Sequence, residues 1–174
     1  FAARVAVSTF EQVRPYVAAE IELGEAALTA EKPLCYVRTS GTTDQPKDLP
    51  LTASHLKSLR DIQETAIAFQ HRQCPEAFSG AMLAIVSPPR EGVLANGRPF
   101  GSASGFVAGS TPRIVRNKFV VPPIVLTIKD CQLKYLLILR LALSRNDLTY
   151  IATANPVTIL TLVRLFRQHH EALI

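Results

Sequence analysis

The chain has 174 residues, of which 48% are hydrophobic and 19% are charged, and its formal net charge is +5. This composition is typical of one folded domain and excludes an intrinsically disordered chain. The basic residues are scattered and aromatic residues are few, so we expect no nucleic-acid partner.

The cysteine pattern indicates a reducing environment. The cysteines are odd in number and form no C-x-x-C pair, so neither a disulfide framework nor a zinc site is indicated. We expect reduced, mostly buried thiols in a cytoplasmic protein. The three residues are Cys35, Cys74 and Cys131.

The sequence also argues against a membrane protein and indicates a fragment. The most apolar stretch, residues 119–143, is interrupted by prolines and charged residues, so we expect no membrane span and no membrane partner. The chain opens with Phe1, without a signal-peptide pattern, and stops at Ile174 inside an apolar helical pattern. We therefore expect residues 1–174 to be part of a longer protein.

The predicted elements begin with a helix. Residues 8–11 (STFE) have the form of a capping box, and the helical pattern that follows is restarted by Pro15 and ended by Gly24. Residues 34–37 (LCYV) form a short β-prone run, which leads into a loop at residues 39–47 (TSGTTDQPK).

A second helix is expected after this loop. Apolar side chains recur at spacings of three and four over residues 56–69, which is the signature of an amphipathic helix. Strand, small-residue loop and helix in this order predict half of an α/β unit.

The middle of the chain alternates apolar runs with turn-forming residues. Residues 81–86 (AMLAIV) predict a buried strand. Residues 92–109 are rich in glycine and predict a long loop or irregular hairpin, and residues 120–128 predict a further strand entered through two prolines.

The last third predicts helix, strand and helix. Residues 131–144 form a helix buried over most of its circumference, and residues 148–152 form a strand. Asn155 and Pro156 supply an N-cap and a first helical position for the last helix. The alternation predicts an α/β fold with a mostly parallel or mixed sheet flanked by helices.

The loop at residues 39–47 carries the clearest chemical signal. Its hydroxyls and backbone N–H groups are suited to donate to phosphate oxygens, and Gly41 permits their close approach. Lys47 adds a point charge for a polyphosphate or a leaving pyrophosphate. The loop is not a P-loop, because the G-x-x-x-x-G-K-[ST] spacing is absent. From composition alone, a polar surface loop remains an equal alternative.

TSGTTDQPK resembles the phosphate-binding signature of the adenylate-forming superfamily, [ST]SG[ST][ST]G-x-P-K. Its continuation at residues 46–52 (PKDLPLT) resembles one branch, the acyl acid amido synthetases of plant auxin and jasmonate conjugation and their bacterial relatives. The similarity extends over residues 8–174. The further matching segments are residues 36–38 (YVR), 100–105 (FGSASG), 134–137 (KYLL) and 151–156 (IATANP).

The resemblance implies one fold and one activity. Residues 1–174 would be part of the large N-terminal domain of an adenylate-forming enzyme, without the mobile C-terminal domain, and inactive alone. The whole enzyme would use ATP and Mg²⁺ to activate a carboxylic acid as an acyl-adenylate and pass the acyl group to an amine such as an amino acid.

The resemblance also assigns residues to the site. Lys47 would be catalytic, and no metal ligand is assigned. The expected phosphate-binding residues are Thr39, Ser40, Gly41, Thr42 and Thr43.

One residue departs from the family pattern, which has glycine where this chain has Asp44. A carboxylate ~6 Å from a phosphate repels it by ~3 kcal/mol at an effective dielectric constant of ~20. Solvent screening, or a magnesium ion shared with Asp44, would remove most of this repulsion. Asp44 and the truncation leave a non-catalytic nucleotide- or acyl-binding remnant open as an alternative. The superfamily offers a second alternative, a coenzyme A ligase.

Other polar residues are weaker candidates. We expect His55, His169 and His170 to be surface histidines, and Asp130 to be a helix N-cap rather than a metal ligand. Ser102 and Ser104 lack an identifiable base and are expected to be turn residues.

Overall fold

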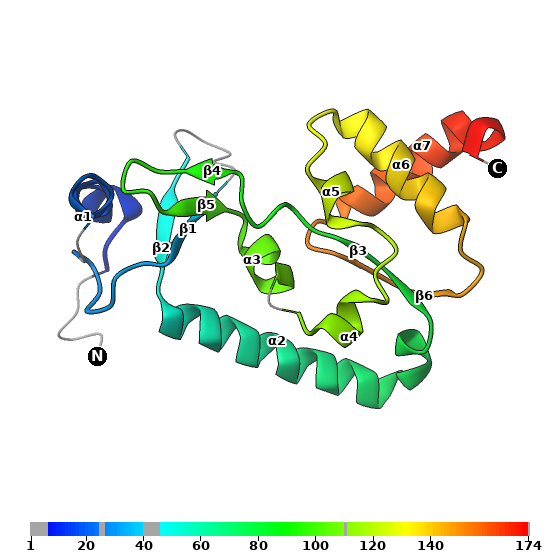
Figure 1. The fold of residues 1–174 in the computed structure, drawn as a ribbon, viewed down its shortest axis with the longest axis horizontal. Coiled ribbons are helices and arrows are strands. Elements are labelled where there is room, and N and C mark those ends of the chain that lie inside the picture. The colour runs from blue at the N-terminus through cyan, green and yellow to red at the C-terminus, as the bar shows by residue number, and fades with distance from the viewer. Residues whose placement is uncertain (1–6, 25–26, 40–45, 110, 174) are drawn as a thin grey trace. The chain divides into compact units, whose positions relative to one another are not determined.

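The computed structural model describes residues 7–24, 27–39, 46–109 and 111–173 (Figure 1). The chain divides into two compact units. Unit 1 comprises Phe1–Ser58 and Arg90–Ala103, and unit 2 comprises Leu59–Pro89 and Ser104–Ile174. Helix α2 (Ala53–Gln73) runs through the boundary between Ser58 and Leu59. Its position confirms the helix that the apolar spacing of residues 56–69 predicts.

Unit 1 contains a four-stranded mixed sheet in the order β2-β1-β5-β4. The hairpins β1–β2 and β4–β5 are antiparallel, and β1 pairs with β5 in parallel. Because β2 is an edge strand, it accommodates Pro50, whose ring nitrogen has no hydrogen to donate. The strands are β1 (Cys35–Arg38), β2 (Asp48–Leu51), β4 (Gly92–Val93) and β5 (Pro99–Gly101).

Helix α1 (Phe10–Leu23) precedes this sheet. Its capping box lies one residue later than predicted, since the N–H of Thr9 donates to Oε1 of Gln12 at 2.8 Å. Gly24 ends the helix as predicted, with a φ of 69° that favours glycine. The restart at Pro15 was wrong: the helix is continuous, and the proline removes only one hydrogen bond on a solvent-facing turn.

A buried hydrogen-bond network joins α1 to the sheet. The hydroxyl of Tyr36 in β1 donates to Oε1 of Glu20 in α1 at 3.2 Å and accepts from Nδ2 of Asn96 at 3.1 Å. The other oxygen of Glu20 accepts from the N–H of Ala27 at 3.1 Å. Burial, reinforced by the Glu20 carboxylate, raises the pKa of Tyr36 to about 12. The network fixes β1, and therefore the start of the loop at residues 39–47, against α1.

Replacing Tyr36 by phenylalanine is expected to lower the free energy of unfolding by about 1–3 kcal/mol, because it removes a donor from a buried carboxylate. Tyr16→Phe is the matched control, since Tyr16 lies exposed on α1 and should change stability by less than about 0.5 kcal/mol. Urea denaturation of both variants measures the difference. Equal midpoints for the two variants would show that the network does not stabilise unit 1.

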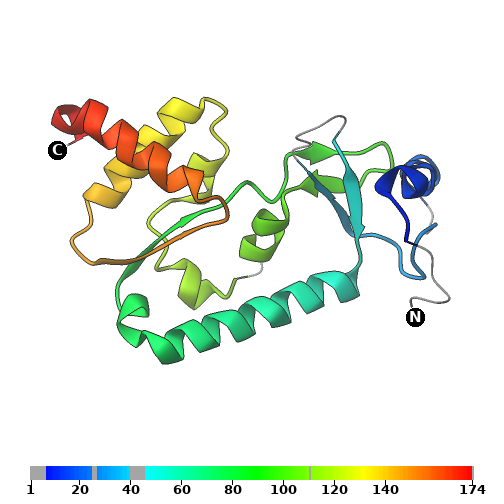
Figure 2. The same ribbon diagram turned by 180° about the vertical axis from the view of Figure 1, so that it is seen from behind.

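Unit 2 is built on the parallel pair β3 (Ala81–Ile85) and β6 (Leu148–Thr153), with α6 (Cys131–Leu143) packed on α7 (Val157–Leu173) (Figure 2). The shorter elements are η1 (Pro75–Phe78), α3 (Ala103–Gly109), α4 (Arg113–Arg116) and α5 (Pro123–Leu126). The core joins β3, α5, α6 and α7. Its members are Leu83, Ile85, Val121, Val125, Ile138, Leu139, Ala142, Leu162, Leu165 and Leu173.

Most predicted elements of unit 2 are confirmed. β3, α6 and β6 lie at the predicted positions, and Oδ1 of Asp130 accepts from the N–H of Leu133 at 3.0 Å, which confirms the N-cap. Oδ1 of Asn155 caps the N–H of Val157 at 3.0 Å. The strand predicted at residues 120–128 was wrong: the helix α5 lies there, because adjacent prolines favour a helix start. The loop or irregular hairpin predicted at residues 92–109 is confirmed by β4–β5, and only its end differs, since Ala103–Gly109 form α3.

The structure also corrects the expected burial. The predicted helices α2, α6 and α7 form, yet each exposes apolar side chains, so burial of α6 over most of its circumference was wrong. Cys35 is buried, but Cys74 and Cys131 are exposed, which corrects the expectation of mostly buried thiols. The exposed apolar residues include Ile62 and Phe69 in α2, Leu133 in α6, and Leu160 and Val163 in α7. Of the helices described here, none has both the length and the apolar character that crossing a membrane requires.

Candidate functional site

The segment TSGTTDQPK connects the neighbouring antiparallel strands β1 and β2. The predicted strand before the loop is confirmed, as is a helix that begins at Ala53. The direct step from loop to helix was wrong, because β2 lies between them. Thr39 and Lys47 are described. The other residues of the signature up to Pro46, residues 40–45, lie outside the described residues; they include Ser40, Gly41, Thr42, Thr43 and Asp44.

Backbone hydrogen bonds hold the two ends of the loop together. The N–H of Thr39 donates to the carbonyl of Lys47 at 3.0 Å. The N–H of Lys47 points back to Oγ1 of Thr39, at 3.4 Å. The two predicted site residues that are described therefore face each other across the base of the loop, and both are half-buried.

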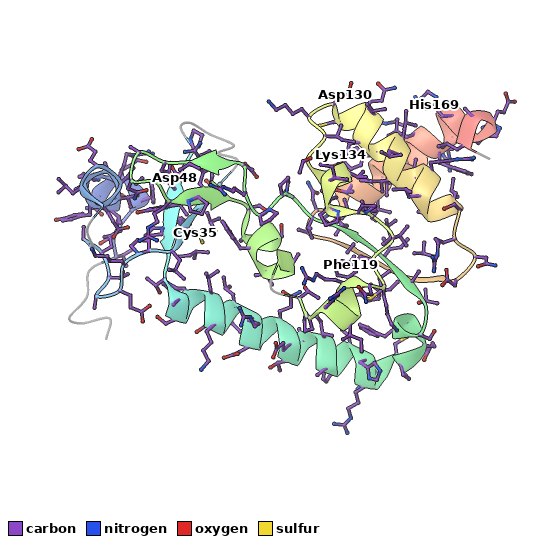
Figure 3. The ribbon with its side chains drawn as sticks, in the orientation of Figure 1. Cys35, Asp48, Phe119, Asp130, Lys134 and His169 are labelled. Carbon is purple, nitrogen blue, oxygen red and sulfur yellow. The ribbon has the colours of Figure 1, made fainter. Side chains whose placement is uncertain are left out.

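An ion pair lies one step further along the strands. Nε and Nη2 of Arg38 each donate to one oxygen of Asp48, both at 2.8 Å. Asp48 is labelled in Figure 3. The guanidinium carbon of Arg38 lies 3.7 Å from the ring centroid of Phe100 in β5. The hydrogen bonds to Asp48 raise the pKa of Arg38, so its positive charge is secure at any physiological pH.

The ammonium of Lys47 lies near the first turn of α1. Its Nζ is 5.2 Å from the ring centroid of Phe10, a cation–π distance. The pKa of the neighbouring Glu11 is lowered, first by its hydrogen bond to Arg14 and to a lesser extent by the charge of Lys47. The side chain predicted to meet the phosphates therefore lies at the exit of the loop, close to α1.

The strand order places a second segment at the same edge of the sheet. Because β1 and β5 are parallel, their carboxyl ends lie at the same edge of the sheet. The loop begins there directly after Arg38, and Ser102 directly follows Gly101, the last residue of β5. Ligands of α/β proteins bind at the carboxyl ends of parallel strands. The sheet of unit 1 therefore places the start of the predicted phosphate loop and Ser102 at the same edge.

The weaker candidates lie elsewhere. His55 is exposed on α2 and lines an open groove of about 340 Å³ together with Glu31 and Ser58. His170 is exposed on α7, and the neighbouring His169 is half-buried. Ser104 lies inside α3, so its prediction as a turn residue was wrong. Within the described ranges, no cluster of three potential metal ligands occurs.

Sequence reasoning missed the contribution of Arg38, Asp48 and Phe100. The signal was present in outline, since Arg38 directly precedes the loop and Asp48 directly follows it. A residue directly before a loop and a residue directly after it become cross-strand neighbours only if both flanking segments are strands that pair with each other. Because the sequence analysis predicts no strand at residues 48–51, the pairing was not apparent.

The comparisons with known proteins agree with the fold. The solved acyl acid amido synthetase AtGH3.15, in complex with 2,4-DB, superposes with a TM-score of 0.80 at 21% identity, over 99% of this chain and 31% of that chain. A second GH3.15 structure gives a TM-score of 0.78 at 20% identity, over 97% of this chain and 30% of that chain. The chain therefore spans less than a third of either protein's length. No curated protein sequence gives a significant match. The model of the GH3 family N-terminal domain matches residues 1–174, so the chain belongs to the GH3 family.

Proposed function

We propose that this chain forms the N-terminal part of the adenylation domain of an acyl acid amido synthetase. The whole enzyme would join a carboxylic acid to ATP, release pyrophosphate, and transfer the acyl group from the adenylate to an amine such as an amino acid. Family membership supports the reaction class. The observation that carries the proposal is the hairpin β1–β2, which presents TSGTTDQPK between two paired strands at the carboxyl edge of β1 and β5.

The proposed roles follow from charge. During adenylate formation, negative charge accumulates on the α-phosphate and on the departing pyrophosphate, and fixed donors stabilise it best when they are already in place. We assign these donors to Thr39, Ser40, Gly41, Thr42 and Thr43, and we assign to Lys47 the neutralisation of the leaving pyrophosphate. Thr39 and Lys47 are already hydrogen-bonded to each other. Their further ordering when ATP binds would therefore cost little conformational entropy.

Magnesium is proposed to enter with ATP. Mg²⁺ prefers oxygen ligands and keeps several waters, and in nucleotide sites it is held largely by the phosphates. The loop offers hydroxyl oxygens and the carboxylate of Asp44, a donor set that Mg²⁺ accepts. The protein groups would orient the metal-bound phosphates rather than enclose the ion.

Replacing Asp44 by glycine restores the family pattern and is expected to lower the KM for ATP several-fold, because it removes a negative charge beside the phosphates. Steady-state kinetics at saturating acid measures this change. The neighbouring change Gln45→Ala is the control and should leave the KM for ATP nearly unchanged. A higher KM for ATP in Asp44→Gly, with a steeper dependence on Mg²⁺, would assign Asp44 to holding the metal.

The proposed function is tested with the complete protein that carries this chain. Pyrophosphate exchange into ATP is expected only when a suitable carboxylic acid is present. A second step then separates the acceptors, because an amido synthetase forms an amide with an amino acid and a coenzyme A ligase forms a thioester. Absence of exchange across a panel of aryl and alkyl acids would favour the binding remnant.

A further inference from the structure

The two strands that flank the loop are joined by more than backbone hydrogen bonds. Arg38 and Asp48 are direct partners in the register of β1 and β2, and both N–H···O contacts of their ion pair are 2.8 Å. Only 16% of the Asp48 side chain and 32% of the Arg38 side chain are exposed. A bidentate, partly buried pair of this kind is among the stronger polar contacts in proteins.

A third side chain fixes the plane of the pair. The guanidinium of Arg38 lies 3.7 Å from the ring centroid of Phe100, whose own register partner is Tyr36 in β1. Stacking on an aromatic face restricts the rotation of a guanidinium and adds cation–π attraction. The contact extends the pair from β1 and β2 to β5, the strand that leads into Ser102.

The pair also selects the strand register. A slip of one residue would place Arg38 opposite either Lys47, with repulsion between like charges, or Leu49, with the guanidinium unpaired. Such a slip would also turn the side chain of Lys47 to the opposite face of the hairpin. The observed register therefore pairs the charges of Arg38 and Asp48, whereas neither one-residue slip does so.

We propose that Arg38, Asp48 and Phe100 form a positioning clamp, which holds the two ends of the phosphate loop in the register that directs Thr39 and Lys47 to ATP. This inference rests on the proposed function. The clamp residues touch no phosphate themselves; they act through the paired backbone of Thr39 and Lys47, which is the next step along the hairpin. Loss of the clamp misplaces the loop without removing any group that meets the substrate.

The test uses Asp48→Asn in the complete protein, because asparagine keeps the shape of the side chain and removes its charge. The KM for ATP should rise about tenfold while the KM for the acid stays within about twofold, since small displacements of binding groups have effects of this size. Hydrogen exchange without ATP gives a second readout. The amide of Thr39, which donates to the carbonyl of Lys47, should exchange faster in the variant.

The chain supplies a matched control. Arg145 and Asp147 form another bidentate ion pair, at 2.7 and 2.6 Å, in unit 2, whereas the loop belongs to unit 1. Asp147→Asn should leave both KM values and the exchange of the Thr39 amide unchanged. Arg38→Lys is the second variant, because it keeps the charge, loses the fork geometry, and should give an intermediate KM for ATP.

The outcomes separate the clamp from the proposed function. A wild-type protein without acid-dependent exchange would overturn the proposed function, whereas the hydrogen-exchange result would still decide whether the clamp orders the loop. An active wild type with unchanged KM for ATP in Asp48→Asn and Arg38→Lys would overturn the clamp alone. Equal rises in the KM values for ATP and acid would also overturn it, since they would indicate general loosening of the fold.

Discussion

Replacing Lys47 by alanine is expected to lower the rate of acid-dependent pyrophosphate exchange about 100-fold in the complete protein, the usual loss when one transition-state donor is removed. The ammonium meets charge that only ATP brings, so binding of the acid should change little. Pyrophosphate exchange at saturating ATP, combined with calorimetric titration of the acid, separates the two effects.

The control for this prediction is Lys57→Ala, since Lys57 is exposed on α2 and is assigned no role. Its exchange rate should equal that of the parent. If Lys47→Ala also retained the parental rate, Lys47 would have no part in the mechanism. Its role would then be structural, through its cation–π contact with Phe10.

The second large effect is expected from residues 1–174 expressed alone, which should show no pyrophosphate exchange with any acid. The chain covers only 31% of the solved relative. Adenylate formation also needs groups that bind adenine and ribose, a pocket for the acid, and exclusion of water from the adenylate. In the described part of the chain, we propose contact with ATP only for the two ends of the predicted phosphate loop, and we assign no residue to these other tasks.

Residues 1–174 expressed alone should also self-associate. Helix α7 exposes Leu160 and Val163, β6 exposes Ile151, and apolar surface of this kind favours aggregation. Size-exclusion chromatography and exchange assays on the purified 174 residues measure both properties. A soluble monomer with robust exchange would contradict the proposal that the remainder of the enzyme completes the site.

Local sequence signals predicted the elements whose structure depends on residues close to one another in the sequence. The caps at Asp130 and Asn155 were readable because their side chains bond to backbone groups two or three residues away. The apolar run at β3 and the spacing of apolar residues in α2 were equally local.

The missed features depend on partners distant in the sequence. Strand β2 contains Pro50 and shows weak strand propensity, and it forms because β1 offers an edge next to it. Burial of Glu20 was not predictable either, since its partner Tyr36, which in turn accepts from Asn96, becomes its neighbour only after the sheet has formed.

The candidate site was likewise predictable only in part. Its signature at residues 39–47 identified the loop, but the sequence did not show that Arg38 and Asp48 meet beneath it. Thr39 and Lys47 lie at the paired ends of the connection between β1 and β2. Their contacts with phosphate, like the roles of the other loop residues, stay predictions.

The most direct test of the central proposal is to identify the products formed from ATP by the complete protein with a carboxylic acid and an amino acid. We predict AMP, pyrophosphate and the amide in equal amounts by mass spectrometry, with an acyl-adenylate accumulating when the amino acid is omitted. Release of ADP and inorganic phosphate, or no consumption of ATP with any acid, would contradict adenylate formation and with it the function proposed for the loop.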